Sequence, residues 1–261
     1  MRQVEEAGPN GFRMDVKAIL IAGGHGSRLY PFTHYTQKTM LPIYNRPVID
    51  YALGTIRRAG IRDITIVSNQ FIGQITKHVG QGLEGERIHY VIEEEPRGVS
   101  HALSLARPYN ENARLLVYFS DNITTIELAE QVAGFREAKE APGCILLARE
   151  EEKPHEFGVC EFDEQGTLIK IHEKPKQPQS NLAIGGIYIY DERFWNFLDE
   201  AAQRSGEFFS ITEINNIYVQ HGHAHLLNVG HDSWIDCGNP DSLLQASLLA
   251  KEGRINPTPY R

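Results

Sequence analysis

A long glycine-rich connection between an apolar run and a helical pattern constrains the fold of this chain more than any other stretch. The run Val16–Ala22 (VKAILIA) is rich in branched side chains, which is the pattern of a strand buried on both faces. Apolar residues at helical spacing predict a helix over Val48–Ala59. Gly23, Gly24 and Gly26 open the connection between the two. A strand, a glycine-rich turn and a helix in this order indicate an α/β fold.

The connection has the composition of a phosphate-binding loop. Its glycines allow positive φ angles and let backbone N–H groups approach phosphate oxygens. Arg28 can add a planar two-point grip, and Lys38 a compact point charge. The loop is not a Walker A motif, because no Gly-Lys-Ser/Thr closes it, and Leu29 replaces the third glycine of a dinucleotide fingerprint. A glycine-rich turn with two solvated cations remains the alternative.

Strands and helices alternate along the first half of the chain. We predict strands at Ile61–Ser68, Ile88–Ile92 and Leu115–Phe119, and helices at Gln70–Val79 and Val99–Ala106. This alternation implies βαβ crossovers and a mostly parallel sheet, in which ligands bind beyond the carboxyl ends of the strands. The glycine loop, residues 93–98 and Asp121 all fall at such ends.

From Gly143 the pattern becomes mixed. We predict strands at Cys144–Ala148, Ala183–Tyr190 and Ala224–Val229, a hairpin of Gly158–Asp163 and Thr167–His172, and helices at Asp191–Ala202, Glu207–Gln220 and Asp241–Lys251. The expected fold class is therefore α/β, with a mostly parallel Rossmann-like sheet flanked by helices and a smaller mixed α+β portion. Residues 14–142 and 143–252 form these two portions of one compact domain, with a flexible extension at 1–13 and an irregular tail at 253–261.

Composition excludes several classes of function. The net charge of −8 argues against nucleic-acid binding, and it requires a local basic pocket for any anionic substrate. No apolar run approaches the roughly 20 residues that span a bilayer, and no signal peptide is visible, so we expect no membrane partner. Three scattered cysteines suggest reduced thiols in a cytoplasm. His221, His223 and His225 lack accompanying ligands, so a solvated strand edge or turn is expected there.

The string from Gly23 to Ile43 resembles the signature of the sugar-1-phosphate nucleotidyltransferases, most closely that of the glucose-1-phosphate thymidylyltransferases. That pattern reads G-G-x-G-[ST]-R-L-x-P-x-T-x(4)-K-x-[ML]-L-P-[IV], and every fixed position is filled here. The resemblance extends from about Met14 to Ala250. It implies a GT-A-like fold in which residues 14–142 bind a nucleotide and residues 143–252 bind a sugar phosphate.

The resemblance also assigns roles to the loop and to two aspartates. It implies nucleotide contacts from five loop residues: Ala22, Gly23, Gly24, Gly26 and Ser27. Arg28 and Lys38 would hold and neutralise the triphosphate as catalytic residues. Asp121 and Asp236 match the family's metal positions and imply Mg²⁺, although an aspartate after a strand is also a common helix cap or turn residue. Ser120 replaces the usual glycine and Cys237 the usual threonine beside them.

For the sugar phosphate, the resemblance implies contacts from Asn122, Gly158, Glu173, Lys174 and Ile184. In the matched Glu-Lys-Pro motif, the glutamate accepts hydrogen bonds from sugar hydroxyls and the catalytic lysine grips the phosphate. A Glu-Lys pair at a strand end is otherwise a solvated ion pair of little consequence. Gly185 replaces a family threonine, which leaves the sugar open.

The base-recognition segment, which includes Pro96 and Gly98, departs from the thymidylyltransferase pattern at one position. Glu93 stands where the family has a glutamine. A carboxylate only accepts hydrogen bonds, whereas an amide also donates. Glu93 can accept the N3–H of thymine or uracil, but it pairs better with guanine or with the cytosine amine.

The expected reaction is transfer of a nucleotidyl group from a nucleoside triphosphate, with dTTP preferred, to a sugar 1-phosphate, with glucose 1-phosphate preferred. The sugar phosphate would attack the α-phosphorus in line and release pyrophosphate, with no protein nucleophile. Guanylyl or cytidylyl transfer is the alternative within this class. A glycosyltransferase with a nucleotide-sugar donor and a non-catalytic sugar-nucleotide sensor are the alternatives outside it. A homo-oligomer is left open.

Overall fold

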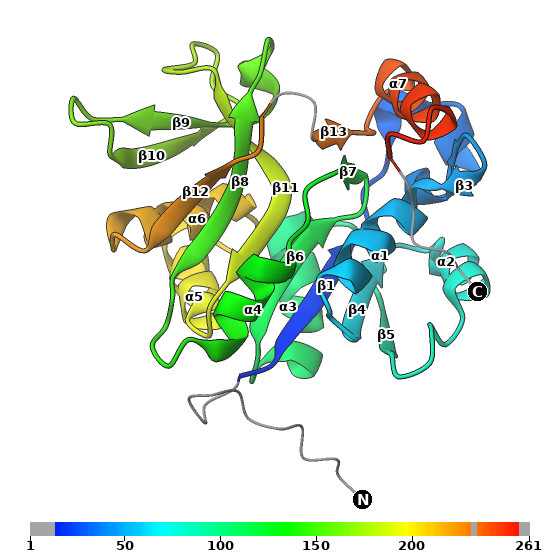
Figure 1. Ribbon diagram of the computed structural model, residues 1–261, viewed down its shortest axis with the longest axis horizontal. Coiled ribbons are helices and arrows are strands. Elements are labelled where there is room, and N and C mark those ends of the chain that lie inside the picture. The colour runs from blue at the N-terminus through cyan, green and yellow to red at the C-terminus, as the bar shows by residue number, and fades with distance from the viewer. Residues whose placement is uncertain (1–13, 231–233, 256–261) are drawn as a thin grey trace, which may run out of the picture.

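The structure is a computed structural model in which residues 14–230 and 234–255 are described. The extension predicted for residues 1–13 and most of the predicted tail, residues 256–261, lie outside these ranges. A nine-stranded mixed sheet forms the centre of the molecule, and helices cover both of its faces (Figure 1). No helix within the described ranges has the length and apolar character needed to cross a membrane.

The first half of the chain forms the parallel part of the sheet, as predicted. Its strands lie in the order β6 (Arg114–Phe119), β1 (Val16–Ile21), β4 (Asp63–Ser68) and β5 (Arg87–Ile92), all parallel. The crossovers contain α1 (Val48–Arg58), α2 (Ile72–Val79) and α3 (Val99–Asn110). The carboxyl ends of β1, β4 and β6 therefore meet at one edge, because Ile21 is in register with Val67 and Phe119.

The second half extends the same sheet with mostly antiparallel strands. These are β8 (Cys144–Glu150), β9 (Gly158–Phe162), β10 (Leu168–Glu173), β11 (Leu182–Tyr190) and β12 (Ala224–Asn228). β11 pairs antiparallel with β6, β8 and β9, whereas β12 pairs parallel with β8. β11 thus joins the two portions into one sheet.

Two apolar clusters occupy opposite faces of the sheet, because successive strand residues point to opposite sides. Ile19 of β1 packs in the cluster that includes α3, α5 (Phe194–Ser205) and α6 (Ile211–Gln220). Its neighbours Ala18 and Leu20 pack in the cluster that includes α1, α2 and α4 (Ala129–Glu137). Burial on both faces explains why β1 is apolar at every position except Lys17.

Several short elements were not predicted. The connection after β1 contains the 3₁₀ turns η1 (Ser27–Leu29), η2 (Phe32–His34) and η3 (Lys38–Met40), and the small hairpin of β2 (Pro42–Ile43) and β3 (Arg46–Pro47). A separate two-stranded ribbon joins β7 (Asn122–Thr124) to β13 (Trp234–Asp236), and it is followed by α7 (Pro240–Lys251). A further 3₁₀ turn, η4 (Pro154–Glu156), precedes β9.

The predicted helix over Glu207–Gln220 begins later than expected, at Ile211. Ser100 of α3 explains the difference, because its hydroxyl donates to the Glu207 carbonyl oxygen at 3.1 Å and accepts from the Phe209 N–H at 3.1 Å. These bonds hold the segment before Ile211 as a loop against α3.

Two of the three histidines at 221, 223 and 225 are exposed at a turn and a strand, as expected, whereas His223 between them is half-buried. His221 caps the carboxyl end of α6 and is exposed, and His225 is exposed on β12. Among the described residues, no group of three or more histidine, cysteine or acidic side chains could hold a metal ion.

Candidate active site

Two neighbouring cavities open at the carboxyl ends of the parallel strands. The glycine-loop cavity, of about 270 Å³, is lined by Gly23, Gly24, Lys38, Glu93, Pro96 and Gly98, among others. The Glu173 cavity, of about 550 Å³, is lined by Arg28, Asn122, Gly158, Glu173, Lys174 and Ile184, among others. Asp121, Val99 and Phe119 line both cavities. Two bound molecules would therefore meet beside Asp121.

Close contacts leave little room for side chains at the glycines of the loop. A Cβ atom on Gly24 would lie 3.1 Å from Lys38 Nζ. Gly26 has φ +62°, and a Cβ atom there would lie 2.9 Å from Thr33 Cγ2. The Thr33 hydroxyl also donates to the Gly26 carbonyl oxygen at 2.7 Å. The glycines thus let the loop fold back upon the Lys38 side chain.

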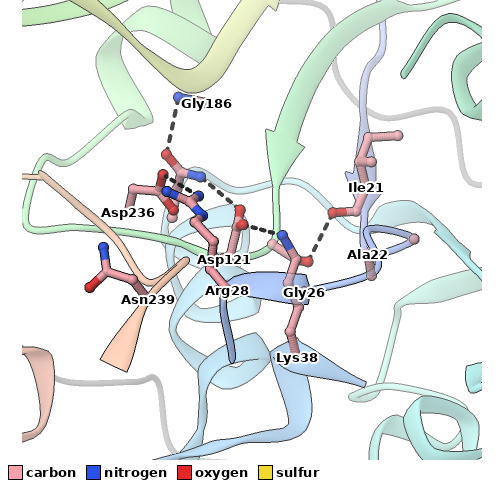
Figure 2. Close-up of polar contacts among 12 residues, drawn as sticks. Ile21, Ala22, Gly26, Arg28, Lys38, Asp121, Gly186, Asp236 and Asn239 are labelled. Carbon is pink, nitrogen blue, oxygen red and sulfur yellow. Dashed lines mark hydrogen bonds and ion pairs between the residues drawn. The ribbon is translucent and has the colours of Figure 1, made fainter. Parts of the chain in front are cut away.

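A cluster of two carboxylates and two cations lies where the cavities meet (Figure 2). Lys38 Nζ donates to Asp121 Oδ2 in a direct ion pair. Arg28 Nη2 lies 3.7 Å from Asp236 Oδ2, and Arg28 Nη1 lies 3.7 Å from Glu156 Oε2. The antiparallel pairing of β7 with β13 holds the two aspartates together, although 115 residues separate them in the chain (236 − 121).

Burial and mutual repulsion set the protonation of this cluster. Burial opposes ionisation of Asp121, but the adjacent Lys38 ammonium outweighs it and lowers the pKa of Asp121 below its ordinary value. Burial also disfavours the Lys38 cation, but Asp121 outweighs this effect and raises the pKa of Lys38. Burial first, and then the charge of Asp121, raise the pKa of Asp236 to about 6. Nearby cations therefore offset the cost of burying the Asp121 charge, but not that of burying the Asp236 charge.

The donor set around Asp236 fits a hard divalent cation. Its Oδ1 atom is buried and has no hydrogen-bond partner within the described part of the chain. The other oxygen atoms that could bind a cation are those of the Asp121 carboxylate. Its Oδ1 atom accepts a hydrogen bond from Asn122 Nδ2 at 2.9 Å. Two carboxylates without histidine or cysteine suit Mg²⁺, which takes few protein oxygens and keeps waters or phosphates as its other ligands.

The Glu173 cavity combines polar groups with aromatic walls. Glu173 Oε2 accepts from Thr212 Oγ1 at 2.5 Å, so the carboxylate is held at one side of the cavity. Lys174 has φ +45°, and its N–H donates to the Phe157 carbonyl oxygen at 2.9 Å. This hydrogen bond links the residue after β10 to the residue before β9. Lys174 and Phe157 both line the cavity.

Trp234 gives a physical reason for glycine at position 185. A Cβ atom on Gly185 would lie 3.1 Å from the Trp234 ring. The indole N–H of Trp234 donates to Asn122 Oδ1, which also accepts from the Gly186 N–H at 3.1 Å. Asn122 therefore fixes both the ring and the β11 backbone, and the wall of the cavity at this point is aromatic.

Most of the residues expected to form the site line one of the two cavities, but three do not. Ala22, Gly26 and Ser27 line neither cavity. Ala22 is buried, and its carbonyl oxygen accepts from the Gln37 amide, so it shapes the loop. Arg28 lines the Glu173 cavity, whereas Lys38 lines the glycine-loop cavity.

The structure adds several residues to the site that were not assigned to it from the sequence. These are Thr212 and Trp234 in the Glu173 cavity, Glu156 beside Arg28, and His101 beside Glu93. Trp234 belongs to the same segment as Asp236, which was the available signal for it. Glu156 and His101 lie in segments that resemble family motifs, but their contacts with Arg28 and Glu93 join different elements and could not be predicted.

Comparison with known proteins agrees with this arrangement. A sequence model of the family described as nucleotidyl transferase matches residues 17–253. A glucose-1-phosphate thymidylyltransferase of Neisseria gonorrhoeae is 31% identical over 90% of this chain and 83% of its own length. The low-salt glycan biosynthesis nucleotidyltransferase Agl11 of Haloferax volcanii is 30% identical over 92% of this chain and 67% of its own length.

Solved structures give the same result. A structure described as a glucose-1-phosphate thymidylyltransferase from Bacillus anthracis in complex with sucrose has a TM-score of 0.83 and 33% identity, and covers 91% of this chain and 96% of its own. A UDP-glucose pyrophosphorylase complexed with UDP-glucose has a TM-score of 0.79 at 21% identity, which supports the fold alone. The chain belongs to the nucleotidyl transferase family and is a nucleotidyltransferase. The family assigned from the motifs is thereby confirmed.

Proposed function

We propose that the protein joins a nucleoside triphosphate to a sugar 1-phosphate, and releases a nucleotide-sugar and pyrophosphate. The observation that carries this proposal is the position of Asp121 between two cavities, each of which also contains a cation. Lys38 lies in the glycine-loop cavity, and Arg28 and Lys174 lie in the Glu173 cavity. Two anionic substrates repel each other, so they can meet only where nearby cations offset that repulsion. The net charge of the whole chain, −8, also repels anions, so these local cations are required.

Each residue has a separate task in the proposed reaction. The glycine loop and Lys38 hold the triphosphate, and Lys174 holds the phosphate of the sugar. An oxygen of the sugar phosphate attacks the α-phosphorus in line, and pyrophosphate leaves from the opposite side, where Lys38 offsets its charge. Arg28, which lies beside Asp236, offsets charge on the reacting phosphates from the Glu173 cavity. No protein nucleophile takes part, so the residues contribute positioning and charge neutralisation.

Asp121 and Asp236 would hold Mg²⁺ in this scheme. The buried Oδ1 atom of Asp236, for which the described residues provide no hydrogen-bond partner, supports the assignment. When bound, the ion offsets phosphate charge and stabilises the charge that develops during transfer. The two aspartates would hold the ion at the β7–β13 ribbon. A hydrogen bond from the Cys237 N–H to the Asp121 carbonyl oxygen at 2.8 Å fixes the backbone there.

Thymidylyl transfer to glucose 1-phosphate is the specific reaction to test first, because several relatives of about 30% identity are named glucose-1-phosphate thymidylyltransferase. In the Glu173 cavity, the Glu173 carboxylate would accept hydrogen bonds from sugar hydroxyls. The Trp234 ring would pack against an apolar face of the sugar.

A pyrophosphate assay tests the proposal. The protein is incubated with dTTP, MgCl₂ and glucose 1-phosphate, and pyrophosphate is measured with a coupled pyrophosphatase. We expect pyrophosphate release that depends on the sugar phosphate and matches the nucleotide-sugar formed. Release of a nucleoside diphosphate in place of pyrophosphate would instead indicate a glycosyltransferase, and binding without turnover would indicate a sensor.

A further inference from the structure

Glu93 lines the glycine-loop cavity, which holds the nucleoside triphosphate in the proposed function. It follows directly after β5 and is only 3% exposed, yet it lines the cavity. A carboxylate so deeply buried needs hydrogen-bond donors beside it, because burial of an unpaired charge is costly. The donors around Glu93 therefore determine what it can still bind.

The two oxygens of the Glu93 carboxylate are in different environments. Oε1 accepts from the Arg97 N–H at 3.2 Å, and it lies 2.9 Å from His101 Nδ1. Because a carboxylate only accepts, Nδ1 is the protonated nitrogen of this histidine. Oε2 lies against the glycine loop, where a Cβ atom on Gly23 would be 2.8 Å from it. No donor in the described part of the chain pairs with Oε2.

The cavity beside Oε2 is bordered by small residues. Gly98 has φ +107°, a conformation that favours glycine, and a Cβ atom there would meet no atom within 4 Å. Pro96, Val99 and Ala102 add apolar lining to this cavity. A base that enters this space therefore meets apolar surfaces on its faces and one acceptor oxygen at its edge.

A lone acceptor distinguishes the bases by their donors. Guanine presents N1–H and the N2 amino group side by side, so both of its edge donors can point to a carboxylate. Thymine presents a single N3–H between two carbonyl oxygens, and both carbonyls then lie close to the negative charge. A polar group that finds no partner on binding loses affinity.

We infer that Glu93 is a specificity-determining residue that makes GTP at least as good a nucleotidyl donor as dTTP. The inference rests on the proposed function, because it concerns the triphosphate of that reaction. Unlike the glutamine of the thymidylyltransferase pattern, Glu93 places no donor in the cavity.

The Glu93→Gln variant reverses this chemistry without changing the shape of the side chain. Its carbonyl oxygen can keep the bonds from Arg97 and His101, since an NH₂ group there would oppose two donors. The NH₂ group then takes the place of Oε2 and faces the base. It can donate to a thymine carbonyl, but it opposes the donors of guanine. Glu94→Gln is the matched control, because Glu94 is exposed and lines neither cavity.

The test compares kcat/KM for GTP and for dTTP in the wild-type, Glu93→Gln and Glu94→Gln proteins, with glucose 1-phosphate and MgCl₂. We expect a GTP-to-dTTP ratio of one or more in the wild type and in Glu94→Gln. In Glu93→Gln the ratio should fall by about tenfold or more. A wild-type ratio below one, or a smaller fall in the variant, overturns the inference.

Equilibrium binding separates this inference from the proposed function. If no triphosphate gives pyrophosphate, the proposed function fails. The same three proteins are then titrated calorimetrically with GTP and with dTTP, without sugar phosphate. The dissociation constant for dTTP divided by that for GTP should be one or more in the wild type and in Glu94→Gln, and should fall by about tenfold or more in Glu93→Gln. Thermal melting of each protein confirms that Glu93→Gln is folded, so that a changed ratio reports recognition.

Discussion

Replacement of Lys38 by methionine would leave the half-buried Asp121 carboxylate without its ion-pair partner, whereas Asp236 would keep Arg28 beside it. The Lys38 side chain is 18% exposed and that of Asp121 is 13% exposed, so solvent screens their ion pair only weakly. Removal of one partner from a buried pair costs roughly 3–5 kcal/mol. Asp121 and Asp236 can limit this cost by taking up a proton, so we expect Lys38→Met to lower the free energy of unfolding by about 3 kcal/mol near neutral pH.

The same variant should show a characteristic pH dependence. In the wild type, Lys38 lowers the pKa of Asp121, so this contribution to stability is present at neutral pH and is lost as the pH falls through the folded pKa. In Lys38→Met, the Lys38 ammonium no longer offsets the effect of burial, so we expect the pKa of Asp121 to rise. The variant therefore regains stability as the carboxylates protonate, and the difference between the two proteins should shrink from about pH 7.5 to about pH 4.5.

Urea unfolding followed by tryptophan fluorescence measures both effects, with EDTA present to remove divalent ions. Lys139→Met is the control, because Lys139 is exposed and should change the free energy of unfolding by less than about 0.5 kcal/mol. A loss below about 1 kcal/mol in Lys38→Met, or a difference that grows at low pH, would refute the reasoning about the buried charge cluster.

Two further variants test the phosphate clamp and a buried ion pair far from it. Arg28→Ala should lower kcat on the order of a hundredfold in the pyrophosphate assay, whereas Arg204→Ala on α5 should not; unaltered turnover would count against Arg28. Glu86→Gln should cost about 3 kcal/mol of unfolding free energy near pH 7.5, because Arg57 binds the carboxylate at 2.8 and 3.0 Å. Burial opposes ionisation of Glu86, but Arg57 lowers its pKa, so the cost should disappear as the pH falls through that pKa in urea titrations.

The parallel half of the fold was predictable because its signals are local. β1, β4 and β6 are buried on both faces and read as apolar runs, and each connecting helix has its own periodicity. The antiparallel insertion of β11 beside β6 was not predictable. That pairing joins Ile187 to Tyr118, and a contact over so many residues leaves no pattern in either segment.

The candidate site divides in the same way. The glycine loop, Lys38 and the Glu-Lys turn form continuous motifs, so their residue types alone indicated phosphate chemistry. The short strands β7 and β13 have three residues each, too few for a periodic pattern, yet their pairing brings Asp121 and Asp236 together. The partners of Glu93 could not be predicted either, because the roles of its two oxygens follow from how α3 packs against β5.

Isotopic labelling of the sugar phosphate tests the central claim most directly. Glucose 1-phosphate carrying ¹⁸O in its non-bridging phosphate oxygens is converted with dTTP or GTP and MgCl₂, and both products are analysed by mass spectrometry. If the sugar phosphate attacks the α-phosphorus, all of the label appears in the nucleotide-sugar and none in pyrophosphate. Label in the released phosphate product would contradict the account, because the sugar phosphate would then not have been the nucleophile.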